Sequence, residues 1–223
     1  MALQKITANS IAANSVGLTQ LNVTDGTNGQ LLKTNGSGTL SFVDAGGGGA
    51  WNVISSTTVS SAVAQIEFTL SGYLDYAIVF RNPTPSSGWN HNRFFFSTNN
   101  GSSYSTNLSQ IEVREPAWTS SSSRTGTSSQ GFVETGEAEN PSFISQNQII
   151  NGIIYLHNNA SGVPKTGIYD TMDFDGRYGV MHEQGAYSID ESSVINKIKY
   201  MLTGNGTTNI ISGTFTLYGI ATS

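Results

Sequence analysis

The stretch Gly213-Thr-Phe-Thr-Leu-Tyr-Gly-Ile220, near the end of the 223-residue chain, alternates between two kinds of residue. Successive side chains of an extended strand point to opposite faces. Phe215, Leu217 and Gly219 therefore fall on one face, while Thr214, Thr216 and Tyr218 fall on the other. This alternation predicts a β-strand with one side in a hydrophobic core.

Segments of the same kind recur through residues 51–223. The run Tyr76-Ala-Ile-Val-Phe80 is apolar throughout, as in a strand buried on both faces. Gly152 interrupts the apolar run 149–156, and an isolated glycine in a strand indicates a β-bulge. Further strands are predicted at 65–70, 93–98, 165–172, 179–182 and 196–202, separated by turns rich in Gly, Asn and Ser. Since no window keeps a helical period over three turns, we predict an all-β fold with an antiparallel, jelly-roll-like β-sandwich as its body.

A run of glycines, Ala45-Gly-Gly-Gly-Gly-Ala50, marks a domain boundary, because glycine has no side chain to pack and favours no backbone conformation. We therefore divide the chain into an N-terminal arm (1–44), a linker (45–50) and the body (51–223). Within the arm, residues 29–34 and 39–43 flank Asn35-Gly36, a strong signal for a β-hairpin. An isolated hairpin is marginal in water, so this one is expected to pack on the body, a neighbouring subunit or a larger assembly.

The start of the arm carries apolar residues every five positions, at Ile6, Ile11, Val16 and Leu21. Residues spaced five apart do not share one face of a strand, and they do not share one face of a helix either. The repeat suits extended pieces joined by turns, which cannot bury their apolar side alone. It is either a tail with chance similarity between its parts or an anchor that binds another protein surface or winds with its own copies.

Composition excludes several classes of function. Only 11% of the residues are charged, against about 25% in ordinary soluble domains, and the formal net charge is −5. A chain with so little positive charge is not expected to bind nucleic acid. Its apolar runs are far shorter than the ~20 residues of a membrane span, and the absence of cysteine excludes disulfides.

No motif for catalysis or for a cofactor stands out, and we predict no cofactor. The segment Asp170-Thr-Met-Asp-Phe-Asp175 is a loose match to a calcium loop, but it lacks the later glutamate, so turn capping is the favoured interpretation. Paired carboxylates for glycosidic cleavage could come from five residues, Glu134, Glu137, Glu139, Asp173 and Asp175. His182-Glu183 could supply a base, yet we expect no enzyme.

Two polar stretches, 83–92 and 118–139, are predicted as loops. Aromatic side chains in such surroundings either pack at the end of a sandwich or bind sugars, whose C–H faces stack on aromatic rings. The candidates for glycan contact are Trp89, His91, Tyr104 and Trp118, and Tyr187 has a similar setting.

The arm and body together resemble a known class of protein. Residues 26–44, Gly26-Thr-Asn-Gly-Gln-Leu-Leu-Lys-Thr-Asn-Gly-Ser-Gly-Thr-Leu-Ser-Phe-Val-Asp44, resemble a G-x-x-G-Q-x-L-x-x-N-G-x-G-x-L-x-W unit of tail fibres and related virion appendages of tailed bacteriophages. Phe42 replaces the usual tryptophan. The five-residue repeat, the run beginning at Trp51 and the closing strand are also similar to such proteins, whose C-terminal domains are β-sandwiches.

The resemblance implies a non-enzymatic, homotrimeric structural protein on the exterior of a phage virion. Its arm would contact sister chains and other tail or capsid proteins, and the sandwich would face outward toward a host-surface glycan. The expected attachment residues are Ile6, Ile11, Val16, Leu21, Leu31, Leu32, Leu40 and Phe42. Because tail fibres are usually much longer, a capsid-decorating cement protein is the alternative. A polysaccharide-cleaving enzyme that uses Glu134 or Asp173 is the third possibility.

Overall fold

The computed structural model describes residues 26–44, 50–116, 123–139, 149–175, 179–204 and 206–221. The chain divides into two units, Met1–Gly49 and Ala50–Ser223. Every regular element in the described part is a β-strand, and all strand pairs are antiparallel. The predicted all-β fold is confirmed.

The first unit contains a β-hairpin of β1 (Gln30–Thr34) and β2 (Leu40–Asp44), in which Leu32 pairs with Phe42. Asn35 organises the connecting turn, since its Oδ1 accepts hydrogen bonds from the backbone N–H groups of Ser37 and Thr39 at 2.8 and 3.1 Å. The hairpin was predicted from sequence, but its turn is longer than the two residues that Asn-Gly usually supports.

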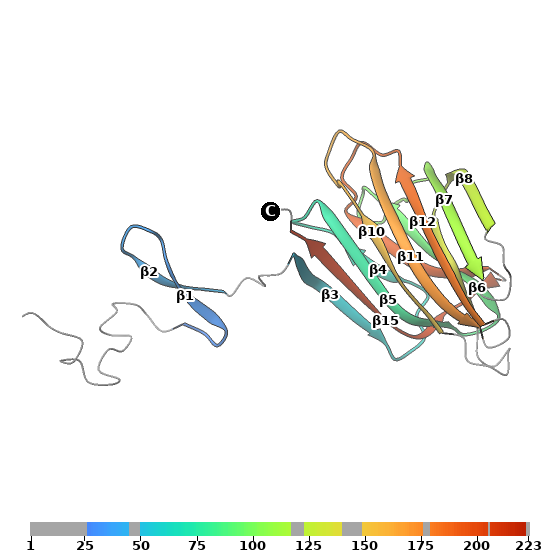
Figure 1. Ribbon diagram of the computed structural model, residues 1–223, viewed down its shortest axis with the longest axis horizontal. Helices are drawn as coiled ribbons and strands as arrows, with labels where there is room; N and C mark the ends of the chain where they lie inside the picture. The colour runs from blue at the N-terminus through green and yellow to red at the C-terminus, as the bar shows by residue number, and fades with distance from the viewer. Residues whose placement is uncertain are drawn as a thin grey trace, which may run out of the picture. The chain divides into compact units, whose positions relative to one another are not determined.

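The body is a sandwich of two sheets. The large sheet has the order β3-β15-β5-β10-β11-β12-β7-β8, which Figure 1 shows running across the body in that order. Its strands are β3 (Trp51–Val59), β15 (Ile210–Ile220), β5 (Asp75–Pro85), β10 (Ile149–Leu156), β11 (Lys165–Asp175), β12 (Gly179–Ile189), β7 (Leu108–Pro116) and β8 (Ser123–Gln130).

The small sheet has the order β14-β13-β6-β9, with β4 also paired to β13. Its strands are β14 (Gly206–Thr207), β13 (Lys197–Gly204), β6 (Trp89–Ser97), β9 (Val133–Glu139) and β4 (Ile66–Thr69). Arg93 pairs with Glu134 and His91 with Glu137, so two residues of β9 oppose one residue of β6 between these pairs. Gly136 occupies this bulge with a φ of 86°, a conformation that favours glycine.

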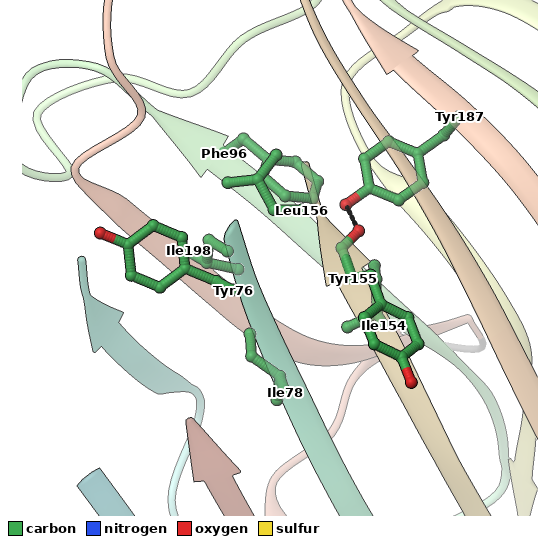
Figure 2. Close-up of a pocket in the computed structure, with 8 residues that line it drawn as sticks. All are labelled: Tyr76, Ile78, Phe96, Ile154, Tyr155, Leu156, Tyr187 and Ile198. Atoms are coloured by element: carbon green, nitrogen blue, oxygen red, sulfur yellow. Dashed lines mark hydrogen bonds between the residues drawn. The ribbon is translucent and has the colours of Figure 1, made fainter. Parts of the chain in front are cut away.

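A single hydrophobic core fills the space between the sheets. It includes Phe80, Phe94, Tyr200 and Phe215, whose rings lie 4.8–6.2 Å apart between centroids. Figure 2 shows another part of this core, where the Tyr187 hydroxyl donates a hydrogen bond to the Tyr155 carbonyl at 2.6 Å. The space among the side chains in Figure 2 has no room for a water molecule, so it is packing and not a ligand site.

Four glycines on the inner side of the large sheet lie directly beneath aromatic rings. A Cβ atom on Gly167 would come within 2.1 Å of the Tyr155 carbonyl oxygen and 2.2 Å of the Tyr187 ring. The other pairs are Gly152 with Phe80, Gly185 with Tyr169, and Gly219 with Tyr73. Gly152 pairs in register with Phe80 and Thr171, so the predicted bulge at this position is wrong. The residue is a glycine because the Phe80 ring occupies the space of a side chain.

The two predicted loops are also wrong in part. Residues 83–92 belong to β5 and β6 except for a short turn, and residues 123–139 form β8 and β9 around a turn at 131–132. Both stretches are polar because their strands lie near sheet edges or carry buried polar groups such as Asn90 and Asn92. Trp118 lies outside the described residues.

Gln110 ties the two sheets together. Its side-chain amide accepts a hydrogen bond from the Glu134 N–H at 2.9 Å and donates to the Glu134 carbonyl at 2.6 Å. The same Nε2 lies 2.7 Å from the hydroxyl oxygen of Tyr169. The side-chain amide of a β7 residue thus forms hydrogen bonds with backbone groups of β9, and a sequence pattern cannot reveal such a contact between distant strands.

Candidate functional site

The outer side of the small sheet combines charged and aromatic side chains. On β6, Asn90, Asn92 and Phe94 are buried, so the alternation turns His91, Arg93 and Phe95 outward. On β13, Ile198 and Tyr200 are buried, and Lys197 and Lys199 point outward. We call this surface, formed by Glu67, His91, Arg93, Phe95, Tyr104, Phe132, Glu134, Lys197 and Lys199, the charged face.

Glu134 is the centre of an ion-pair group at one end of this face. Its carboxylate lies 2.8 Å from Arg93 Nε and 3.0 Å from His91 Nδ1. Partial burial raises the pKa of Glu134, but the hydrogen bonds and charges of His91 and Arg93 outweigh this effect and lower it below its ordinary value. A carboxyl group held as its anion is poorly suited to act as a general acid near neutral pH.

Cations also contact three aromatic rings of the charged face. Lys199 Nζ lies 4.0 Å from the centroid of the Tyr104 ring and 4.7 Å from that of Phe95. The Arg93 guanidinium lies 4.0 Å from the centroid of Phe132. Burial lowers the pKa of Lys199, while the charge of Glu67 opposes this change. These are cation–π contacts, which stabilise the sheet surface.

The predicted glycan contacts are therefore only partly assembled. His91 and Tyr104 lie on the charged face, Trp89 is the first residue of β6, and Trp118 falls outside the described part of the chain. One face of the Tyr104 ring is covered by the Lys199 ammonium group. A sugar that stacked on that face would have to displace the cation.

The two catalytic candidates whose side chains the structure describes, Glu134 and Asp173, do not converge. Asp173 is 2% exposed and points between the sheets, whereas Glu134 interacts with the outward side chains of β6. Glu137, Glu139 and Asp175 lie in β9 and β11, and their side chains are outside the described part of the structure. Glu183, which the sequence analysis named beside His182 as a possible base, is 1% exposed and lies 2.6 Å from Arg114 Nε. This pair is a structural contact in the sandwich interior.

Residues 170–175 form part of strand β11 and not a turn or loop, so both the favoured interpretation as turn capping and the comparison with a calcium loop are wrong. Alternation along the strand sends Asp170 outward, where its carboxylate lies 3.3 Å from His182 Nε2, and sends Asp173 inward. No group of three or more potential metal ligands occurs among the residues that the structure describes. The same residues include no helix long and apolar enough to cross a membrane.

The outer side of the large sheet is apolar instead. Its strand registers align one residue from each of seven successive strands into a row across the sheet. We call this row the apolar band; from β3 to β7 it consists of Val53, Tyr218, Ala77, Tyr155, Ile168, Ala186 and Ile111. Val53, Ile168 and Ile111 are 63%, 50% and 46% exposed. Ala77 in the middle of the row is fully buried, so the exposed apolar surface lies toward the two ends of the band. Exposed apolar surface of this kind is typical of a site of protein association.

The two ends of the apolar band differ in shape. At the β3 end, the Trp51 ring meets Tyr155 and Tyr218 edge-on, with centroids 5.8 and 5.4 Å apart, and Trp51 is itself 40% exposed. At the β7 end, a hollow of about 390 Å³ is lined by Ile111, Val113, Ile168, Asp170, Gln184 and Ala186, among others. The small Ala186 side chain lies between the two isoleucines in register, which explains the hollow.

The attachment residues of the first unit are found only in part. Leu31 and Leu32 are 60% and 41% exposed, and Leu40 and Phe42 are half-buried. A Cβ atom on Gly26 would meet the Phe42 ring at 2.6 Å, so this ring covers the glycine at the start of the described segment. Ile6, Ile11, Val16 and Leu21 lie outside the described residues.

Comparisons of the chain with protein-family models, curated proteins and solved structures found no match. The resemblance to phage appendages therefore stays a prediction.

Proposed function

We propose that the chain is a non-enzymatic structural protein of a tailed-phage virion, a homotrimer anchored by its N-terminal arm with the sandwich facing outward. One observation carries the proposal. The hairpin β1–β2 belongs to a unit distinct from the body, and it leaves Leu31 and Leu32 largely exposed.

The positions of these leucines indicate what kind of partner they need. Leu31 and Leu32 are consecutive in a strand, so they point to opposite sides of the hairpin. One flat partner surface covers one side only. Two neighbouring copies of the arm in a trimer would cover both, and would provide the extra strands that a lone hairpin needs for stability.

The body supports a role in binding rather than in chemistry. Two of its carboxylates, Glu134 and Glu183, are held in ion pairs with Arg93 and Arg114. Binding of a host-surface glycan is the finer proposal for the charged face, since His91 and Tyr104 lie there. The covered face of the Tyr104 ring weakens this proposal relative to a purely structural role.

The trimer is tested by light scattering on the full chain at micromolar concentration. We expect a mass three times that of one chain, and we expect the double variant Leu31→Ser, Leu32→Ser to lower it. Leu74→Ser is the matched control, because Leu74 is 46% exposed in a loop of the body. A monomeric mass for the unmodified chain would contradict the proposal.

The location on the particle separates the tail appendage from the capsid-decorating alternative. Electron microscopy of phage particles with and without the protein would show density lost from the tail or from the head. If it is a cement protein, the heads of particles without it should break open on heating or at low salt. If it is a tail appendage, its loss should leave head stability unchanged and lower adsorption to the host.

A further inference from the structure

The apolar band has a projection at one end and a hollow at the other. Val53 is the most exposed large hydrophobic side chain described on the body, and it lies beside Trp51 on the edge strand β3. The hollow lies on β7, β11 and β12 with Ala186 at its centre. Both features are on the same outer side of the large sheet.

A single chain cannot bring its own projection to its own hollow. Five strand steps separate β3 from β12 in the sheet. At about 4.8 Å between neighbouring strands, the distance is about 24 Å. The two complementary features can therefore meet only between different molecules.

We propose that a second copy of this chain docks on the apolar band, with its Trp51–Val53 end in the hollow around Ala186. The choice of a second copy rests on the self-assembly proposed above. Each chain carries both the projection and the hollow, so two or three copies can fill one another's hollows in a closed two-fold or three-fold arrangement. In the proposed trimer, each body would insert its β3 end into the hollow of the next.

The band provides the apolar centre that such a contact needs. Its seven strands span about 29 Å, and the band together with one neighbouring row spans about 14 Å along the strands, which gives about 400 Å². A standard protein interface buries about 800 Å² on each partner, so the rows around the band would supply the other half. Trp51, Tyr155 and Tyr218 add aromatic side chains of the types that are enriched at such interfaces.

The rows around the band are more polar than the band itself. The row on one side contains Asp75, Thr166 and Ser188, and a row farther along the strands on the other side contains Arg81 and His182 but also the 55% exposed Met172. Polar side chains in such positions are typical of the rim that surrounds the apolar centre of an interface.

Disulfide trapping tests the inference directly, since the chain has no cysteine of its own. In the full-length double variant Val53→Cys, Ala186→Cys, the two thiols of one chain are too far apart to bond, because a disulfide needs Cα atoms within about 7 Å. We expect mild oxidation to yield covalent dimers or trimers in most of the protein. The pair Val53→Cys, Val194→Cys is the matched control, because Val194 is 43% exposed in a loop away from the band. It should cross-link at least tenfold less.

A third substitution checks that the hollow itself is responsible. Ile168→Arg, added to the Val53→Cys, Ala186→Cys variant, should reduce cross-linking at least tenfold, whereas Val194→Arg should leave it unchanged. Cross-linking no greater than in the control pair would overturn the inference. An occupant of the hollow other than a second copy of the chain would also leave cross-linking at the control level.

The light-scattering mass is measured on the same samples. A trimer without cross-links contradicts this inference alone, cross-linked dimers contradict the trimer alone, and an uncross-linked monomer contradicts both.

Discussion

The two outer sides of the sandwich arise from the same strand alternation but present different chemistry to solvent. On the small sheet, outward positions carry Arg93, Glu134 and Lys199, and the rings among them are in contact with cations. On the large sheet, the outward positions of the apolar band carry Ile111, Tyr155 and Ile168. The charged face satisfies its own groups within one chain, whereas the apolar band has exposed surface that another molecule can cover. Alternation alone thus shows which residues leave the core but not whether they remain in water.

The largest effect is expected from the inner side of the large sheet, on which the apolar band depends. Gly167→Val would place a Cβ atom 2.1 Å from the Tyr155 carbonyl oxygen and against the Tyr187 ring. Because backbone cannot move aside cheaply, we expect a loss of more than about 4 kcal/mol of unfolding free energy, measured by thermal denaturation. Gly126→Val is the control in β8 of the same sheet, where the nearest atom to a new Cβ is 4.0 Å away. A Gly167→Val protein as stable as the control would show that the ring packing is wrong.

A moderate effect is expected on the charged face, where Glu134→Gln removes the anion that His91 and Arg93 share. The pKa of Glu134 is lowered in the folded protein, so its contribution to stability is present above the ordinary value of 4.5 and is lost as the pH falls through the folded-state pKa. We expect the variant to be about 1 kcal/mol less stable at pH 7 in chemical denaturation, with the difference disappearing at lower pH.

The control for this prediction lies on the other side of the sandwich. Glu115 is 53% exposed on the outer side of the large sheet, 3.7 Å from His182. Glu115→Gln should leave stability nearly unchanged at every pH. Equal losses in the two variants would mean that the charged face is no better organised than the rest of the surface.

The smallest effect is expected from Lys199→Met, which keeps the aliphatic part of the side chain and removes the ammonium group above Tyr104 and Phe95. An exposed cation–π contact contributes about 0.5–1 kcal/mol. The same substitution at the exposed Lys33 of the hairpin is the control.

If the sugar proposal is right, the Lys199→Met variant should also bind glycans more strongly, because one face of Tyr104 becomes free. Unchanged binding on a glycan array would count against that proposal.

The sequence predicted the fold well where the apolar pattern is local. The strands at 149–156 and 213–220 lie where alternation or an apolar run placed them, and the Asn35-Gly36 hairpin forms. Strands β8 and β9 were missed because their side chains are mostly polar and give no apolar alternation. In addition, the hydrogen bonds to the backbone of β9 come from Gln110 on strand β7, and the sequence near β9 gives no sign of this contact.

The surfaces were harder to predict than the strands. Each residue of the apolar band comes from a different strand, so the band exists only through the registers of seven strands. The local sequence around Ile168 or Ala186 gives no sign that they face a common hollow. His91 and Tyr104 were identified as aromatic residues in polar surroundings, but the cation above Tyr104 comes from Lys199, far along the chain.

Hydroxyl-radical labelling of the full chain, read out by mass spectrometry, tests the contrast between the two faces most directly. At assembling concentrations we expect Trp51 and Ile168 to be protected and to become reactive on dilution, while Phe95 and Tyr104 react equally under both conditions. Trp51 and Ile168 that react as readily in concentrated as in dilute protein would contradict the account, because the apolar band would then face water and not a second chain.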